Sequence, residues 1–303
     1  MERNVFALAA VFACACLVGL SIACPKGCDC QGTKVSCTNL NLGRIPDGIP
    51  DGTQILELQK NNIESLPEDA FDVVPFATKI DLCGNNLREI PPKLFRKLKK
   101  LKILKICQNK LKRIGPDILD GLDSLKFLSF EHNELEEIQK DSFVQMKELL
   151  FLDMSANRLA EVPPHCFHGL EKLKTLNMIQ NTFGSIRRGW FGSMPGLNML
   201  DLSENFIKQI ESGAFDGMTN LKVLSIQYNE LSKLPAGTIE NLNELRFLFM
   251  NNNAHLDCQC PLIKGIQKIK DKGDFEIKGW CASPPHLYDR ELKSLDPNEM
   301  DCP

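Results

Sequence analysis

Side chains that could take part in catalysis or metal binding are few and scattered along this sequence. It contains five histidines but no HExxH zinc motif, no GxSxG nucleophile motif and no glycine-rich phosphate loop. The one local cluster is His165, Cys166 and His168. Three ligands so close together on one turn rarely converge on one ion. We therefore expect no metal site, no cofactor and no enzymatic activity.

Cysteines are the other reactive side chains, and eight of the 13 lie in two clusters near the ends of the chain. The clusters are Cys24, Cys28, Cys30 and Cys37, and Cys258, Cys260, Cys281 and Cys302. Each cluster contains an even number of cysteines, and the N-terminal export signal described below precedes both. This combination indicates disulfides formed in an oxidising compartment. Zinc binding is the competing interpretation, which export and the lack of nearby histidines disfavour. Spacing alone leaves three pairings open in each cluster.

The N-terminus has the pattern of an export signal. An apolar run from Val5 to Leu20 is followed by the small residues Ser21 and Ala23, a pattern typical of a signal peptide cleaved before Cys24. An uncleaved anchor is the alternative, because ~18 apolar residues can span a bilayer. We expect cleavage, a secreted or cell-surface protein, and no transmembrane segment after cleavage.

Composition places the chain among ordinary globular proteins. Charged residues make up 25% and hydrophobic residues 43% of its 303 residues, and the net charge is −3. A near-neutral chain of this kind gives no indication of a nucleic-acid partner.

The secondary structure that positions these residues can be predicted from a sequence repeat. The pattern LxxLxLxxNxL recurs along the chain with a period of 24 residues. With Leu125 as position 1, an asparagine stands at position 9 of every repeat: Asn61, Asn85, Asn109, Asn133, Asn157, Asn181, Asn205, Asn229 and Asn253. Such a period predicts an elongated repeat array rather than two globular domains. One repeat cannot bury its leucines alone, whereas stacked repeats share one continuous core.

The pattern within each repeat predicts a strand and a return segment. Positions 3 to 7 alternate, as Phe127 to Glu131 show, with Leu128 and Phe130 inward. The position-9 asparagine is expected to be buried and to satisfy backbone groups. A second apolar column stands at position 19, in Phe71, Phe95, Phe143, Phe167, Phe191 and Phe215, with Leu119 and Ile239 as substitutes. The narrower strand side predicts a curved array with a parallel sheet on the inside.

Five segments follow from the repeat and the cysteines. They are a signal peptide (1–23), an N-terminal cap (24–52), eight full repeats (53–244), a partial ninth repeat (245–255) and a C-terminal cap (256–303). In the last segment Leu262, Ile266 and Ile269 recur at helical spacing, which predicts a short helix over the last repeat.

The CxxxCxCxxxxxxC cap, the 24-residue LxxLxLxxN repeats and the CQC closure resemble extracellular leucine-rich-repeat proteins with a cysteine-rich cap at each end. Phrases such as GRIPDGIPDGTQILELQKNNIESLPEDAF are similar to variable lymphocyte receptors and their invertebrate relatives, and also to Slit repeats and small leucine-rich proteoglycans. The resemblance implies an α/β-type solenoid: a curved horseshoe with a concave parallel sheet, an irregular or short-helical convex face and disulfide caps. It also implies the pairs Cys24 to Cys30, Cys28 to Cys37, Cys258 to Cys281, and Cys260 to Cys302.

Ligand contacts are expected at positions 3, 5, 7 and 8, on the solvent side of the sheet. Position 3 is apolar in Ile55, Ile103, Phe127, Phe151, Met199, Val223 and Phe247, with Lys79 and Thr175 as exceptions. An exposed apolar stripe often marks a binding site. The alternative is that the stripe is half covered by its neighbours.

The full set of predicted contacts adds the varied positions 5, 7 and 8. It comprises Phe127, Ser129, Glu131, His132, Phe151, Asp153, Asn177, Ile179, Gln180, Met199, Asp201, Glu204, Gln227, Tyr228, Phe247, Phe249 and Asn251. Tyr228 and Phe249 are the expected anchors, because aromatic side chains dominate interface energies.

Two further features have alternative interpretations. Residues 93–113 are rich in lysine and arginine, which indicates either a solvated surface or a patch for an anionic partner such as a sulfated glycan; the patch would comprise Lys97, Lys99, Lys100, Lys102 and Lys105. Cys83 and Cys107 both occupy position 7. Strand spacing brings their Cα atoms into disulfide range, but parallel Cβ directions oppose a bond, so a bridge and free thiols both stay open.

We interpret the chain as a non-enzymatic recognition protein that binds a protein or glycan on the concave face. The resemblance implies an immune or pattern-recognition role like that of variable lymphocyte receptors. The alternative is a matrix or signalling-ligand binder of the proteoglycan or Slit type, which could bind glycosaminoglycan.

Overall fold

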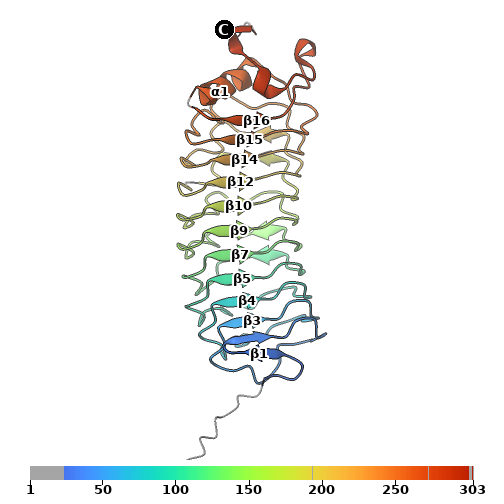
Figure 1. Ribbon diagram of the computed structural model, residues 1–303, viewed down its shortest axis with the longest axis vertical. Helices are drawn as coiled ribbons and strands as arrows, with labels where there is room; N and C mark the ends of the chain where they lie inside the picture. The colour runs from blue at the N-terminus through green and yellow to red at the C-terminus, as the bar shows by residue number, and fades with distance from the viewer. Residues whose placement is uncertain (1–23, 193, 272, 300–301, 303) are drawn as a thin grey trace, which may run out of the picture.

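The computed structural model describes residues 24–192, 194–271, 273–299 and 302. It is an elongated stack in which twelve strands lie side by side, from β1 at the N-terminal end to β16 at the C-terminal end (Figure 1). The predicted signal peptide, residues 1–23, lies outside the described residues. Within the described ranges, no helix has the length and apolar character needed to span a membrane.

The main sheet is built from one three-residue strand per repeat, at positions 3 to 5. All neighbours pair in parallel except the hairpin of β1 and β2. The strands are β1 (Asp29–Gln31), β2 (Lys34–Ser36), β3 (Ile55–Glu57), β4 (Lys79–Asp81), β5 (Ile103–Lys105), β7 (Phe127–Ser129), β9 (Phe151–Asp153), β10 (Thr175–Asn177), β12 (Met199–Asp201), β14 (Val223–Ser225), β15 (Phe247–Phe249) and β16 (Glu276–Lys278). Equal positions are in register, as in the pairing of Leu128 with Leu152, so each repeat position forms one row along the stack.

The return segments consist of turns, with two small sheets added. β6 (Arg113–Ile114) pairs with β8 (Glu137–Ile138), and β11 (Ser185–Ile186) pairs with β13 (Gln209–Ile210). The convex face is irregular in the described residues between 53 and 255, which is one of the two forms that the family resemblance implies. Prolines early in several return segments, such as Pro91 and Pro235, explain this in part, because proline removes a helix hydrogen-bond donor.

Two apolar layers fill the space between the strands and the return segments. The inward leucines of the strands, such as Leu128 and Leu152, are completely buried. The predicted position-19 column is buried as well, and Phe143, Phe167 and Phe191 stack in sequence with 5.9 Å between successive ring centroids. The core is therefore continuous along the array, and stacked repeats share it.

The stack curves with the sheet on the inner side. On the sheet, the rings of Phe127 and Phe151 lie 4.6 Å apart, whereas position-19 rings one repeat apart are separated by 5.9 to 6.1 Å. Repeats that are closer together on the sheet side than on the return side must fan outward. The sheet is therefore the concave face, as the sequence predicts.

The position-9 asparagines connect neighbouring repeats through buried hydrogen bonds. The amide Nδ2 of Asn157 donates to the carbonyl oxygens of Phe130, Met154 and Ser155 at 3.0 to 3.1 Å. Its Oδ1 accepts from the Leu135 N–H at 3.0 Å. Two of these partners, Phe130 and Leu135, belong to the preceding repeat. The asparagine thus pairs backbone groups that the turn after the strand leaves free.

A cap closes each end of the core. At the C-terminal end, helix α1 (Cys260–Lys270) buries Leu262, Ile266 and Ile269, which confirms the predicted helix. The cap also adds strand β16 to the sheet and three short 3₁₀ turns, η1 (Pro285–Leu287), η2 (Leu292–Ser294) and η3 (Pro297–Glu299). Strand β16 was not predicted, because its sequence lies outside the repeat.

Disulfides link both caps and one pair of strands. The caps contain the four pairs that the family resemblance implies: Cys24 to Cys30, Cys28 to Cys37, Cys258 to Cys281, and Cys260 to Cys302. A fifth bond joins Cys83 to Cys107, with Cα atoms 4.5 Å apart. The bridge, which the sequence left open, is therefore present. Of the described cysteines, Cys166 alone is free, and it is buried.

Removal of one asparagine side chain should strongly destabilise the array. We expect Asn157→Ala to lower the free energy of unfolding by roughly 3 to 5 kcal/mol, because several buried backbone groups lose their partner at once. The neighbouring Arg158 is exposed, and Arg158→Ala should cost less than about 1 kcal/mol. Urea denaturation followed by circular dichroism measures both. Equal losses for the two variants would contradict the role given to Asn157.

The bridge between Cys83 and Cys107 can be tested by mass spectrometry. Alkylation in denaturant without reductant should label Cys166 and leave a linked peptide pair containing Cys83 and Cys107. The double variant Cys83→Ser/Cys107→Ser should lose about 3 kcal/mol of stability, the chain-entropy value for a loop of this length. Labelling of all three cysteines in the unreduced protein would show that the bridge does not form.

Candidate functional site

The concave face presents four rows of side chains, at positions 3, 5, 7 and 8. In the position-3 row every side chain except that of Phe247 is half-buried. The reason is contact along the row: the rings of Phe127 and Phe151 stack with only 4° between their planes. The predicted apolar stripe therefore exists as a row, but most of its surface is covered, and Phe247 is the large side chain in it that stands 40% exposed.

Several side chains of the position-5 row stabilise the backbone after their own strand, a role that the sequence analysis did not predict. In four described repeats a position-5 side chain accepts a hydrogen bond from the backbone N–H two residues later. The acceptors are Asp81, Ser129, Asp153 and Asp201, at 2.9 to 3.3 Å. Ser129 and Asp201 are also buried, so their prediction as exposed ligand contacts was wrong. An acceptor followed two residues later by a turn is the local signal that identifies this role.

The position-8 row is the most exposed part of the face. His132, Gln180, Glu204 and Tyr228 all adopt left-handed backbone conformations, with φ between 53° and 54°. All four side chains are exposed, and Tyr228 is 49% exposed. Because this conformation recurs after the strands, it holds a solvent-facing side chain beside most of the buried asparagines, whereas Gly84 stands at this position beside Asn85.

The remaining predicted contacts are half-buried on the same face. Position 7 contributes Glu131, Ile179, Gln227 and Asn251, and position 5 contributes Asp153, Asn177 and Phe249. Three buried polar atoms here have no hydrogen-bond partner within the described part of the chain: Gln59 Oε1, Ser155 Oγ and Asn177 Oδ1. These atoms would be satisfied by water or by a polar ligand group.

Aromatic side chains gather at the C-terminal end of the face. The rings of Phe247 and Phe249 lie 6.2 Å apart, and Lys278 places its Nζ 5.5 Å from the centroid of Phe249. Lys278 lies on β16, next to a pocket of about 400 Å³ that is also lined by Trp280. Sequence reasoning missed Lys278 and Trp280 because it did not predict β16. Trp280 is 45% exposed and extends the aromatic surface beyond the repeats.

Ion pairs between side chains link the strands at the N-terminal end of the face. The carboxylate of Glu57 pairs with Lys34 at 3.0 Å and with Lys79 at 2.9 Å. Burial of Glu57 acts to raise its pKa, but the hydrogen bonds and charges of Lys79 and Lys34 outweigh it and hold the pKa below the ordinary value of 4.5. These charges are already compensated, so this end offers fewer free groups than the aromatic end.

The predicted anion patch does not form one surface. Lys97 pairs with Asp72, and Lys99 pairs with Asp123 at 3.0 Å. Lys100 lies over the ring of Phe76 and Lys105 over that of Phe127, while Lys102 is exposed at the start of a strand. The five residues belong to the return side, the strand edge and the concave face, because a run of neighbours in sequence winds around the solenoid.

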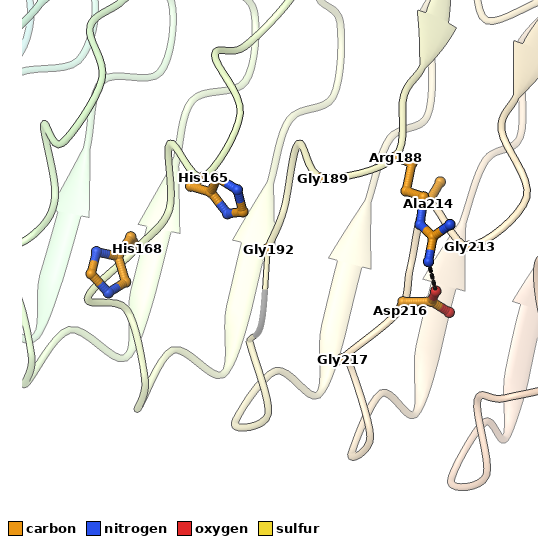
Figure 2. Close-up of a pocket in the computed structure, with 9 residues that line it drawn as sticks. All are labelled: His165, His168, Arg188, Gly189, Gly192, Gly213, Ala214, Asp216 and Gly217. Carbon is orange, nitrogen blue, oxygen red and sulfur yellow. Dashed lines mark ion pairs between the residues drawn. The ribbon is translucent and has the colours of Figure 1, made fainter.

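The cluster of His165, Cys166 and His168 lies on the return side. Figure 2 shows both histidines at a shallow pocket of about 470 Å³, whose lining also includes Arg188 and its ion-pair partner Asp216 at 3.5 Å. The Cys166 thiol is buried, and desolvation followed by the charge of Asp141 raises its pKa to about 12. In the described ranges, no group of three histidine, cysteine or acidic residues is placed to hold a metal ion.

Comparison with known proteins agrees with this geometry. The leucine rich repeat family matches residues 77–135, 128–183, 152–205, 180–222 and 196–254, and the leucine rich repeat N-terminal domain matches residues 23–50. The matches cover more than half of the chain. This protein belongs to the leucine-rich-repeat family.

Curated leucine-rich-repeat relatives match over short segments. The chain is 39% identical over 71 residues to leucine-rich repeat-containing protein 3 of Danio rerio, covering 22% of this chain and 27% of that protein. It is 43% identical over 61 residues to human chondroadherin-like protein, covering 20% and 8%. It is 47% identical over 55 residues to the acid labile subunit of the insulin-like growth factor-binding protein complex of Papio hamadryas, covering 16% and 9%. The chain thus spans about a quarter or less of the length of these relatives.

Solved leucine-rich-repeat structures share the fold over most of the chain. A chain in the octameric complex of Latrophilin 3, Unc5D and FLRT2 superposes with a TM-score of 0.66 at 24% identity, covering 92% of this chain and 100% of that chain. A chain in the Drosophila Toll–Spatzle complex gives a TM-score of 0.68 at 23% identity, covering 82% and 35%. At this level of identity the likeness establishes the fold.

The ion pairs of Glu57 should give stability that depends on pH. Since the folded-state pKa is lowered, their contribution is present above pH about 4.5 and is lost as the pH falls through the folded-state value. The free energy of unfolding of the wild type should exceed that of Glu57→Gln by about 1 kcal/mol near pH 6, and the difference should shrink as the pH is lowered to about 3. Urea denaturation at the two pH values measures this. A difference that does not change with pH would contradict it.

Proposed function

We propose that this protein is an extracellular recognition protein that binds a macromolecular ligand, protein or glycan, on its concave face without catalysing a reaction. The observation that carries the proposal is the contrast between buried and exposed positions. Leucine and asparagine recur at the buried positions of every repeat and phenylalanine in most, whereas the exposed position 8 changes from His132 to Gln180, Glu204 and Tyr228. A fold that holds varied side chains on a constant scaffold suits selective binding.

The size of the face fits a macromolecule. Nine repeat strands at ~4.8 Å spacing give a surface roughly 40 Å long. The four rows supply more side chains than the roughly 20 to 30 residues that one partner contributes to a standard protein interface. The unpaired polar atoms of Gln59, Ser155 and Asn177 offer positions for ligand hydrogen bonds. A small metabolite would use only a fraction of this surface.

The aromatic end is where we place the strongest contacts. Tyr228 and Phe247 are both exposed, and Phe249 lies beside Phe247 with Lys278 over its ring. Exposed aromatic side chains next to a cation are typical of interface hot spots. The predicted anchor Phe249 is half-buried, so we assign more of the contact to Tyr228 and Phe247.

We further propose that recognition serves an immune or pattern-recognition role. The similarity of the repeat phrases to variable lymphocyte receptors supports it. A matrix or signalling role is the second candidate, and the segment shared with chondroadherin-like protein favours it. The ligands distinguish the two: microbial glycans or proteins fit the first role, and host matrix components fit the second.

The concave-face proposal can be tested with an array of microbial and host proteins and glycans probed with the purified protein. For each ligand found, the double variant Tyr228→Ala/Phe247→Ala should weaken binding by about tenfold or more, since hot-spot truncations cost 2 kcal/mol or above. Tyr288 is 71% exposed on the C-terminal cap, and Tyr288→Ala serves as the matched control with unchanged affinity. Ligands that bind the double variant as tightly as wild type would rule out the aromatic end as the contact surface.

A further inference from the structure

The edge of the sheet at which the strands begin carries a row of positive charge. The row consists of the position-2 residues, each of which directly precedes a strand. They are Gln54, Thr78, Lys102, Lys126, Leu150, Lys174, Asn198, Lys222 and Arg246. Five of the nine are basic and none is acidic. We call Lys102, Lys126, Lys174, Lys222 and Arg246 the basic rim.

Backbone hydrogen bonds fix this row directly. The N–H of Lys126 donates to the carbonyl of Lys102 at 2.9 Å, and the same contact recurs at every step up to Arg246, whose N–H donates to Lys222 at 2.9 Å. The spacing is therefore that of the strands, ~4.8 Å, and Lys102 to Arg246 spans roughly 29 Å. The basic rim is a single file of charges that follows the curve of the sheet edge, with Leu150 and Asn198 as uncharged positions within it.

The charges of the basic rim are largely free. All five side chains are exposed. Among the described residues, Lys102 and Lys222 form no ion pair, and Lys126 interacts electrostatically with Glu148, whose carboxylate is paired with Lys172 at 2.6 Å. Lys174 donates to the Gly196 carbonyl at 3.1 Å and Arg246 to that of Asp274 at 3.5 Å. Carbonyl oxygens leave the net positive charge in place. An anionic partner could therefore bind without first displacing a carboxylate from the basic rim.

The opposite edge of the sheet differs in charge. There, acidic residues stand among the basic ones and pair with some of them, as in Arg158 with Glu134 at 3.1 Å and Lys208 with Glu230 at 3.4 Å. The concave face between the two edges carries exposed or half-buried acids such as Glu131 and Glu204. Positive charge is thus concentrated on one edge, where it would hold an anion away from the acidic floor.

We propose that the basic rim is a second binding site, separate from the concave face, for a linear sulfated polysaccharide. A single file of charges about 29 Å long matches one extended polyanionic chain. A nucleic-acid duplex presents two phosphate strands, and single-stranded nucleic acid requires aromatic stacking platforms, which the position-2 row lacks. The five disulfides indicate an oxidising compartment, where sulfated polysaccharides occur.

The proposal can be tested by measuring how a heparin-derived oligosaccharide binds to the wild type and to two variants. Both variants lose the same number of positive charges, but at different edges of the sheet. The rim variant combines Lys102→Gln, Lys126→Gln, Lys174→Gln and Lys222→Gln. The control variant combines Lys60→Gln, Lys112→Gln, Lys208→Gln and Lys233→Gln. All four are exposed on the side where the strands end: Lys60 is at position 8 of the concave face, and the other three follow the buried asparagine of their repeats. Calorimetric titration is carried out at an ionic strength of ~0.15 M, after thermal unfolding has shown that both variants keep the wild-type midpoint.

Wild type should bind the oligosaccharide, the rim variant should lose roughly tenfold or more in affinity, and the control variant should lose less than about threefold. Failure of wild type to bind, or equal losses in the two variants, would overturn the proposal. So would equal or tighter binding of a DNA duplex of the same length. The Tyr228→Ala/Phe247→Ala protein should keep full affinity for the oligosaccharide, which separates this site from the concave-face proposal.

Discussion

The buried asparagine of each repeat is the contact on which the rest of the structure depends. A strand of three residues leaves the following turn with unpaired backbone groups inside the protein, where each would cost about 1 to 3 kcal/mol. The Asn157 side chain pairs such groups in two repeats at once. The repeat is therefore stable only next to another repeat, and this requirement makes the molecule long, continuous and closed by caps.

Separation of scaffold and surface follows from that arrangement. Once leucine, phenylalanine and asparagine hold the backbone, the neighbouring side chains are free to differ without changing the fold. The concave face and the basic rim use this freedom in different ways. The first is a broad surface with an aromatic end, and the second is a single file of charge along the sheet edge. One solenoid thus offers two surfaces of different shape and chemistry.

The residues that form the core could be predicted from the sequence. The roles of the residues on the surface could be predicted only in part. Asn157, Phe167 and Leu262 lie where the repeat and the helical spacing predict, because burial imposes strict periodicity. Ser129 and Asp201 were placed on the correct face but not recognised as acceptors for their own strands, since periodicity gives direction and not hydrogen bonding. Strand β16, the scattering of the basic segment and the basic rim depend on which residues become neighbours across repeats.

The bridge between Cys83 and Cys107 has a mechanical consequence. If the protein were pulled from its two ends, the residues between these cysteines could not extend, which removes about 80 Å of contour length at ~3.5 Å per residue. The cap disulfides likewise prevent residues 24–37 and 258–302 from extending. In the described chain, extension would therefore be confined to residues 38–82 and 108–257, and the longer of these segments contains most of the concave face. Tension along the chain would thus reach the recognition surface before it could disrupt the ends.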